Sequence, residues 1–465
     1  MSRSGRINYI KNTKEKQNKL GLFPTVTIII GGMIGSAIFS LSGLVMWQAG
    51  PASILSYIIA ALIMLCYGLI CAELSCRFKN SGGVYVFPAK SLGKTKNQGK
   101  FWGWLTFWGF INSNIVAIAF SAIYVGAYLS VGFPQLSDMQ IPLALISIIF
   151  VFVLNVLKIS SLGKFNNAFV VALIITMLVF VFVALTNKQW ESRLLTPFFT
   201  QGTQGTLGFM SSIPIVMVSY GAITSAAFIV KDIKNPKRNV PRAMIIALTF
   251  TCLLYVLIIL STLGLITSQY LNDNPDMRYI PLFAVAFTKL SSIPWLSKLI
   301  SISAFLALLT TMLVIMSINS RAICAVANDN LLPKALAKCN KNHVPLNATF
   351  LVTLISCVIA CFPDFTQMLV NLGVLFSVVV IVMICISVIY ARKNNPQKCD
   401  FHAPLGKFLP IATLIILIIC NITNIFSGNI DVYLFTVIWY ILGIIYFCIN
   451  KKIKAKHKLN QDEKF

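Results

Sequence analysis

The sequence is poor in charged residues, and this scarcity sets the class of protein before any motif is considered. Only 11% of the 465 residues are charged, whereas 57% are hydrophobic and the mean hydropathy is +0.82. Soluble domains carry about 25% charged residues, so the composition excludes a soluble protein. Apolar runs of about 20 residues suit the hydrocarbon core of a lipid bilayer when they form helices.

Residues that build metal centres and enzyme active sites are also few or badly spaced. The chain has three histidines, all in polar loops, and its twelve cysteines form no CxxC pair. Scattered cysteines within apolar segments are typical of small core residues rather than of metal ligands. We therefore predict that the protein holds no metal, needs no cofactor and is not an enzyme.

Long apolar runs predict an all-α membrane protein with twelve transmembrane helices. The run at 142–158 is short, and only Pro363 and Asp364 divide the ninth run from the tenth. The first run is too long for a signal-peptide core, so we interpret it as a retained span. A tail at 1–20 precedes the membrane domain of 21–450, and a basic tail at 451–465 is expected to be disordered. The twelve runs are 21–46, 52–75, 103–131, 142–158, 165–187, 207–230, 243–267, 299–327, 347–363, 366–391, 405–425 and 431–450.

The positive charges lie in alternate loops, which predicts the orientation of the chain. The net charge is +25, and all but five of the 38 lysines and arginines lie in the two tails and every second loop. Basic residues collect at the cytoplasmic ends of membrane proteins, so both termini are predicted to be cytoplasmic at a plasma membrane. The basic loop at 231–242 would lie near anionic lipid. This placement argues against a nucleic-acid partner.

Charge is almost absent from the membrane-spanning runs themselves. Only Glu73 and Asp232 touch a span, each at its cytoplasmic edge, and Arg77 one turn onward would pair with Glu73 at the membrane interface. Ionisable residues inside a membrane usually mark proton relays or ion paths. A charged solute would therefore have to be held by neutral polar groups and by the free backbone groups of interrupted helices.

Two similar motifs mark the places where helices are expected to break. GMIGSAIF at 32–39 and GAITSAAF at 221–228 share Gly, Ile, Ser, Ala and Phe at matching positions. Glycine weakens a helix interior by about 1 kcal/mol relative to alanine, and the two spans run in opposite directions, as in an inverted repeat. The alternative is that the small residues only permit close helix packing. The candidate binding residues from this pattern are Gly35, Ser36, Ser219, Tyr220, Gly221 and Thr224.

The third predicted span adds polar candidates. Asn112, Ser113 and Asn114 are consecutive in an otherwise apolar run. An amide facing lipid is costly, so a membrane-embedded asparagine prefers a partner inside the helix bundle. We expect one of the two asparagines to face a central cavity and the other to cross-link helices.

Four ordered motifs resemble amino-acid permeases of the amino acid–polyamine–organocation superfamily. They are GGMIGSAIF at 31–39, the AEL and SGG stretch within 50–87, SYGAITSAAFIVKDIKNPKRNVPRA at 219–243 and SRAICAVANDNLLPKALAK at 320–338. The resemblance covers nearly the whole chain. It implies a five-plus-five inverted repeat, 21–187 and 207–391, with discontinuous first and sixth helices and two C-terminal helices at 405–450.

The resemblance also implies roles for individual residues. Ile34, Gly35, Ser36 and Ala37 match unwound positions whose backbone N–H groups bind a substrate carboxylate, and Tyr220, Gly221 and Ala222 match carbonyl positions that receive the amino group. The predicted substrate is an amino acid with a neutral side chain, or a derived amine, because no charged residue is placed to recognise a charged side chain.

The coupling mechanism rests on a departure from the family pattern. Leu173 stands where some proton-coupled members carry lysine and where related symporters bind sodium, which leaves Thr310 and Thr311 as a possible remnant of a cation site. Leucine neither titrates nor binds sodium, so the favoured mechanism is exchange by alternating access. The alternatives are a proton- or sodium-coupled symporter and, from another class, a channel or an accessory membrane subunit.

Overall fold

The computed structural model describes residues 20–78, 83–157, 162–199, 201–203, 205–224, 233–341, 344–394, 401–427 and 430–462. Within these ranges the regular secondary structure is helical, apart from one isolated β-bridge between Leu20 and Ile233. The predicted N-terminal tail lies almost wholly outside the described residues, as do Asp232 and the second half of the 221–228 motif.

A helix lies at each of the twelve predicted runs. The helices are α2 (Leu22–Met33), α3 (Ser36–Ser40), α4 (Ser42–Ala49), α5 (Ser53–Phe78), α6 (Gly83–Ser91), α7 (Lys96–Gly132), α8 (Gln140–Leu157), α9 (Leu162–Thr186), α10 (Gly205–Ser219), α12 (Pro236–Leu263), α13 (Ser268–Asp273), α14 (Pro281–Thr288), α15 (Pro294–Asn328), α16 (Leu346–Ala360), α17 (Thr366–Asn394), α18 (Phe408–Ser427) and α19 (Ile430–Asp462). In the described part, nine stretches are long and apolar enough to cross a membrane, and three apolar helices are shorter. The count of twelve spans and the inverted repeat stay predictions.

Several helices begin where the sequence carries a recognisable start signal. Proline opens α12, α14 and α15, where its missing N–H and fixed φ suit the first helical position. Thr95 caps α7: its hydroxyl accepts the N–H of Gln98, whose side chain in turn accepts the N–H of Thr95. Local sequence therefore fixes where these long helices start.

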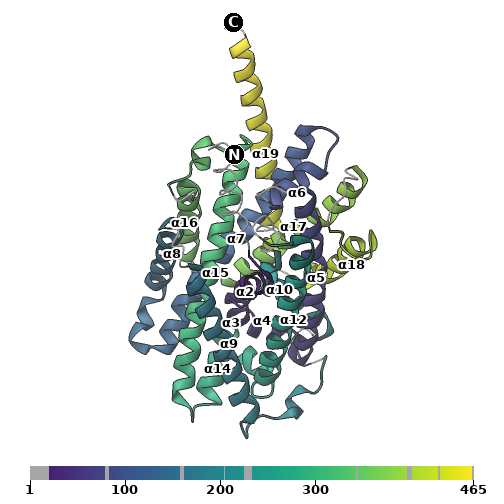
Figure 1. Cartoon of the computed structure of the whole chain (residues 1–465). Helices are drawn as coiled ribbons and strands as arrows, with labels where there is room; N and C mark the ends of the chain where they lie inside the picture. Colours follow the sequence, from purple (N-terminus) through teal and green to yellow (C-terminus); the bar gives the residue numbers. More distant parts are fainter. Residues whose placement is uncertain are drawn as a thin grey trace, which may run out of the picture.

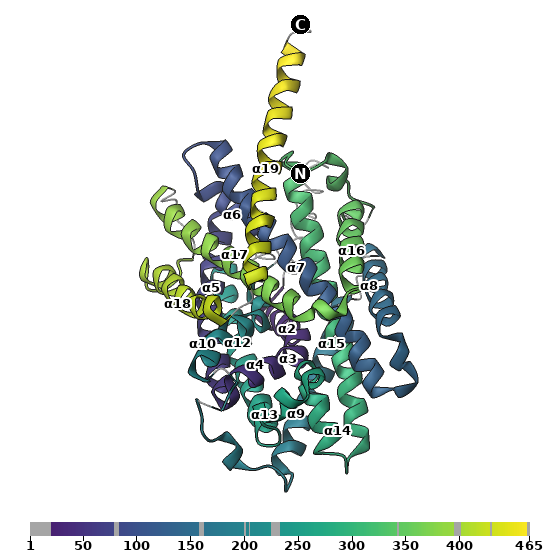
Figure 2. The same ribbon diagram turned by 180° about the vertical axis from the view of Figure 1, so that it is seen from behind.

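The short helices α2 and α3 lie near the centre of the molecule. In both views they are surrounded by α5, α10 and α12 on one side and by the long helices α7 and α15 on the other (Figures 1 and 2). Helices α8 and α16 lie side by side at one edge, and α18 lies at the opposite edge. The interrupted helix is thus placed where neighbours can reach it from all sides.

The C-terminal segment differs from the expectation of a disordered tail. Helix α19 continues to Asp462 and projects beyond the body of the protein (Figure 1). The prediction of disorder was therefore wrong for residues 451–462. The polar composition misled the prediction because a helix that begins in the apolar run can be propagated at little cost once it is nucleated.

The charge pair predicted for Glu73 and Arg77 is present, and the Glu73 side chain is buried inside the protein. Glu73 has no exposed surface, and its carboxylate binds Arg77 at 2.9 Å and Arg392 of α17 at 2.5 Å. The backbone N–H of Ala403 donates to the same carboxylate at 2.9 Å. The distant Arg392 converts a local helix pair into a link between α5, α17 and the segment before α18.

Candidate binding site at two helix breaks

The first helix break lies at Ile34 and Gly35, as the glycine motif predicts. Helix α2 ends at Met33, and α3 starts at Ser36. A Cβ atom built on Gly35 would lie 2.0 Å from Oγ1 of Thr311 in α15, which is an impossible contact. Only glycine allows this close approach of the backbone to α15.

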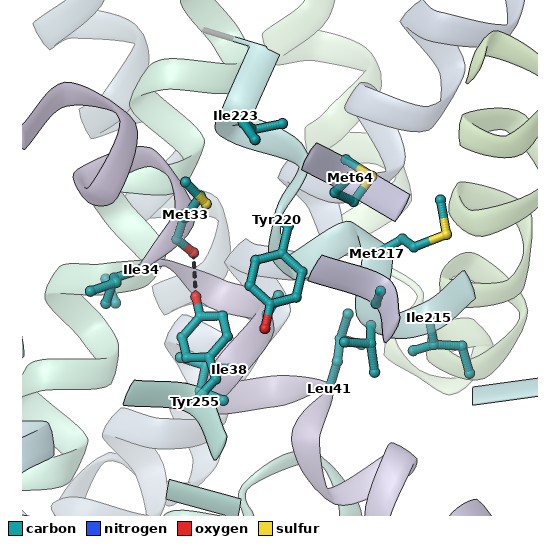
Figure 3. Close-up of a cluster of buried hydrophobic side chains, with 14 of the residues drawn as sticks. Met33, Ile34, Ile38, Leu41, Met64, Ile215, Met217, Tyr220, Ile223 and Tyr255 are labelled. Carbon is teal, nitrogen blue, oxygen red and sulfur yellow. Dashed lines mark hydrogen bonds between the residues drawn. The ribbon is translucent and has the colours of Figure 1, made fainter. Parts of the chain in front are cut away.

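Two side chains from distant helices bind the backbone groups that the break leaves free. The hydroxyl of Tyr255 in α12 donates to the carbonyl of Met33 at 2.6 Å (Figure 3). The N–H of Ser36 donates to Oγ1 of Thr311 at 3.1 Å. A buried backbone group without a partner is costly, so these bonds stabilise a helix interruption that would otherwise be unfavourable.

The second break follows α10, and a hydrogen bond within the short segment after α10 contributes to it. Helix α10 contains Pro214 and ends at Ser219, and the short 3-10 helix η4 (Gly221–Thr224) follows Tyr220. The hydroxyl of Thr224 donates to the carbonyl of Gly221 at 3.1 Å. A Cβ atom on Gly221 would meet no described heavy atom within 4 Å, so this glycine faces open space.

The two breaks meet across a small internal cavity. A Cβ atom on Gly32 would lie only 2.8 Å from Cβ of Ala222, so the two interrupted segments touch. The cavity beside them measures about 200 Å³ and is lined by α2, α3, α5, α7, α10, η4, α15 and α17. Pockets for drug-sized ligands measure about 300–1,000 Å³, so this one suits a small metabolite.

The cavity wall is apolar and carries no Asp, Glu, Lys, Arg or His among the described residues. Apolar side chains from several helices form most of it, notably Met64, Phe110, Met217, Val218, Ile315 and Ile381. The polar groups are hydroxyls and amides, so any ligand charge must be met by dipoles. Backbone groups at the two breaks are the strongest dipoles available there.

A second polar group of side chains lies on α7 and α17. The hydroxyls of Ser113 and Ser377 lie 2.8 Å apart, and both reach the carbonyl of Gly373. Nδ2 of Asn114 donates to Oδ1 of Asn319 in α15 at 3.0 Å. Ser113, Ser377 and Asn114 all line the cavity. They provide neutral hydrogen-bonding groups in an otherwise apolar wall.

The structure brings some of the predicted site residues to the cavity and leaves others behind it. The residues that line it are Gly35, Ser36, Ala37, Asn114, Gly221, Ala222, Thr224 and Thr311. The residues buried outside its lining are Ile34, Asn112, Ser219, Tyr220, Leu173 and Thr310. Side chains of the second group do not form the cavity wall, although the backbone roles predicted for some of them stay predictions.

The two asparagines of α7 do not share the two predicted roles, one facing the cavity and the other cross-linking helices. Asn114 both lines the cavity and cross-links helices, so one residue carries the two roles that were predicted for two. Asn112 is buried, and its amide nitrogen has no hydrogen-bond partner among the described residues. Because a helix turns by about 100° per residue, or about 200° over two residues, these two asparagines face different surroundings.

The role of Leu173, Thr310 and Thr311 as a possible remnant of a cation site stays a prediction. Leu173 is buried, and the hydroxyls of Thr310 and Thr311 both donate to the carbonyl of Ala307 in their own helix at 2.9 Å. Only Thr311 reaches the cavity, where it accepts the N–H of Ser36. Its hydroxyl is thus engaged by protein groups on both sides.

Several residues that shape the site are not singled out by the sequence. Tyr255 binds the end of α2, and Met64, Tyr67 and Ser377 line the cavity. Each belongs to a long apolar helix with no local signal that separates a cavity residue from a packing residue. Their roles come from long-range packing, which periodicity alone does not reveal.

Fold and cavity together define a helical membrane protein with a central cavity, and the described residues that line the cavity carry no charged side chain. The family model described as amino acid permease matches residues 20–449, and the chain belongs to this family. The chain is 26% identical to the branched-chain amino acid permease BcaP of Bacillus subtilis and 28% identical to the methylthioribose transporter of the same organism, each over 96% of both chains. It is 24% identical to BcaP of Lactococcus lactis over 92% of this chain and 93% of the relative. The family and these relatives are transporters, not enzymes.

Proposed function

We propose that this protein is a secondary transporter that carries a neutral amino acid across the plasma membrane by alternating access. The observation that carries the proposal is the cavity that lies between the break at Gly35 and the end of α10 and has no charged side chain among its described lining residues. A zwitterion needs a donor group for its carboxylate and an acceptor group for its ammonium. The N–H groups at the start of α3 and the carbonyls at the end of α10 supply these two groups at one site.

The apolar wall favours a neutral, branched or thioether-containing side chain. Met64, Phe110 and Ile381 line the cavity and offer dispersion contacts but no hydrogen bonds. A cationic or acidic side chain would lose its hydration there without a compensating partner. The names of the two BcaP relatives agree with this substrate class.

A second candidate substrate is a methylthio-sugar. The methylthioribose transporter is 28% identical to this chain, and Ser113, Ser377 and Asn114 place hydroxyl and amide groups on the cavity wall. Sugar hydroxyls bind such neutral groups, while a methylthio group fits an apolar wall. A methylthio-sugar has no carboxylate, so it would not bind the N–H groups at the start of α3 as an amino acid would.

The transport cycle that fits these residues is exchange. Leu173 supplies neither a proton site nor a cation ligand, and the hydroxyl of Thr310 donates to the carbonyl of Ala307 in its own helix. We place α2–α4, α5, α10 and α12 in a bundle that rocks against α7 and α15 within a twelve-span inverted repeat, with both termini cytoplasmic. A decarboxylated amine is the candidate counter-substrate.

A transport assay with reconstituted protein tests the proposal. Proteoliposomes preloaded with unlabelled leucine, lysine, glutamate or methylthioribose are given radiolabelled leucine and, separately, radiolabelled methylthioribose. We expect fast leucine uptake into leucine-loaded vesicles and slow uptake into empty, lysine-loaded or glutamate-loaded vesicles. Uptake of methylthioribose alone would favour the second candidate. Uptake by empty vesicles that follows an imposed proton gradient would contradict exchange, and flux without saturation would indicate a channel.

A further inference from the structure

One hydrogen bond joins the first helix break directly to the long helix α15. The N–H of Ser36 donates to Oγ1 of Thr311 at 3.1 Å across a sequence separation of 275 residues. The same hydroxyl donates its only proton to the carbonyl of Ala307 at 2.9 Å. Thr311 is therefore held by its own helix in the orientation that accepts Ser36.

This bond has the right position to respond to a ligand. Ser36 and Thr311 both line the cavity. Gly35, which precedes Ser36, has no side chain that would separate the start of α3 from α15. A ligand carboxylate in the cavity would compete with the Thr311 oxygen for the Ser36 N–H. Hydrogen bonds to an ionised acceptor are about twice as strong as those to a neutral one, so the carboxylate has the advantage.

The bond also connects α3 and α15, which move relative to each other in the proposed transport cycle. In the proposed cycle α3 belongs to the rocking bundle and α15 to the surrounding helices, so this inference rests on the proposed function. Movement of the empty protein would leave the Ser36 N–H without a partner in a site of low polarity, which is unfavourable. Movement of the loaded protein would leave that N–H bonded to the ligand.

We propose that Thr311 is a latch that holds the empty carrier in place and that the substrate carboxylate releases it by taking over the N–H of Ser36. The latch gives a physical reason for exchange: the loaded carrier reorients readily, and the empty carrier does so slowly. Thr311 is thus a positioning residue that acts on the rate of the empty step.

The chain supplies matched controls for this residue. Thr310 is adjacent, and its hydroxyl donates to the same carbonyl of Ala307, but it does not line the cavity. Tyr128 of α7 donates to the carbonyl of Phe39 in α3 at 2.6 Å, so it also joins the two parts, although it lies outside the cavity lining. A ligand cannot replace the Tyr128 bond, so its loss should affect the empty and loaded steps alike.

The experiment compares exchange with net flux in purified full-length protein in proteoliposomes. The probe is a radiolabelled mixture of the protein amino acids, taken up by vesicles that are empty or preloaded with the unlabelled mixture. The variants are Thr311→Val, Thr311→Ala, Thr311→Ser, Thr310→Val and Tyr128→Phe. Gel filtration and thermal unfolding establish that each variant is folded before its flux is measured.

We expect net uptake into empty vesicles to rise about three- to tenfold in Thr311→Val and Thr311→Ala, the range that loss of one neutral hydrogen bond gives. In these two variants the ratio of exchange to net flux should fall by the same factor. The ratio should stay at the wild-type value in Thr310→Val and Tyr128→Phe, and Thr311→Ser should restore it. If the wild-type protein transports amino acids, and both folded Thr311 variants keep the wild-type ratio of exchange to net flux, the latch alone would be overturned. No wild-type flux in either kind of vesicle would overturn the amino-acid transport function, and the latch with it.

Discussion

The two helix breaks have similar sequences but different packing. At the first break, Gly35 contacts α15 so closely that a single methyl group would lie 2.0 Å from Thr311. At the second, Gly221 faces space in which a methyl group meets no described atom within 4 Å. The first break is bonded by Tyr255 and Thr311 from distant helices, whereas the hydroxyl of Thr224 bonds the second break locally.

This difference shows that the same small residue can have two functions. At Gly35 the missing side chain makes room for a neighbouring helix, so the requirement is steric. At Gly221 the missing side chain leaves room for a ligand, so the requirement is the size of the cavity. A substitution at Gly35 should therefore displace α3 from α15, whereas a substitution at Gly221 should reduce the volume of the cavity.

The largest effect is expected for Gly35→Ala. The added methyl group would force α3 away from α15 and displace the Ser36 N–H, so uptake should fall by more than about tenfold, as expected for a small misplacement of binding groups. Membrane insertion should stay normal, because the change adds one apolar group. Uptake in proteoliposomes and the amount of inserted protein are measured together.

A double variant checks the steric reason. Adding Thr311→Ala to Gly35→Ala removes Oγ1, the atom at 2.0 Å, and leaves the Thr311 Cβ at 3.3 Å. Part of the uptake should return. Undiminished uptake in Gly35→Ala itself would remove the first break from the binding site.

The next effect is expected for Tyr255→Phe. This change removes the 2.6 Å hydrogen bond to Met33 and leaves a buried carbonyl without a partner, which costs about 1–3 kcal/mol of folding free energy. Thermal unfolding of the purified protein should show a lower midpoint. Tyr440→Phe is the control, because the buried Tyr440 hydroxyl has no hydrogen-bond partner among the described residues. Equal midpoints in the two variants would contradict the role assigned to Tyr255.

A smaller effect, dependent on ligand size, is expected for Gly221→Ala. The methyl group fits without a clash but takes volume from the cavity. The KM of the largest accepted amino acid should rise by about tenfold, which is typical for one methyl group in a pocket, while the smallest accepted amino acid is little affected. Competition of unlabelled amino acids against labelled leucine measures this. A uniform loss for all sizes would mean that Gly221 is needed for folding or movement instead.

The smallest effect is expected for Thr224→Val. The hydroxyl of Thr224 bonds the carbonyl of Gly221 within one short turn, and such a local bond contributes about 0.5–1.5 kcal/mol. Uptake should fall by less than about threefold, with no change in the ratio of exchange to net flux. A larger loss than in Gly35→Ala would reverse the comparison between the two breaks.

The sequence predicts the helices and the first break well, and the rest of the site less well. The glycine motif at 32–39 predicts the interruption at Ile34 and Gly35 because glycine has a local conformational effect. Asn112 and Asn114 have the same chemistry, and only the rotation of α7 separates the cavity residue from the buried one. The contacts of Ser377 and Tyr255 depend on α17 and α12, which are distant in sequence.

The sequence by itself determines that this is a helical membrane protein of the amino acid permease family, that its helices are almost free of charge, and that a glycine motif interrupts the first of them. These properties follow from composition and local backbone preference. Tertiary structure alone decides that Thr311 and Tyr255 bond the first break, that Arg392 joins Glu73, and that the cavity has an apolar wall. The physical reason is that each of these contacts joins residues far apart in the chain, and only the packing of whole helices brings them within hydrogen-bonding distance.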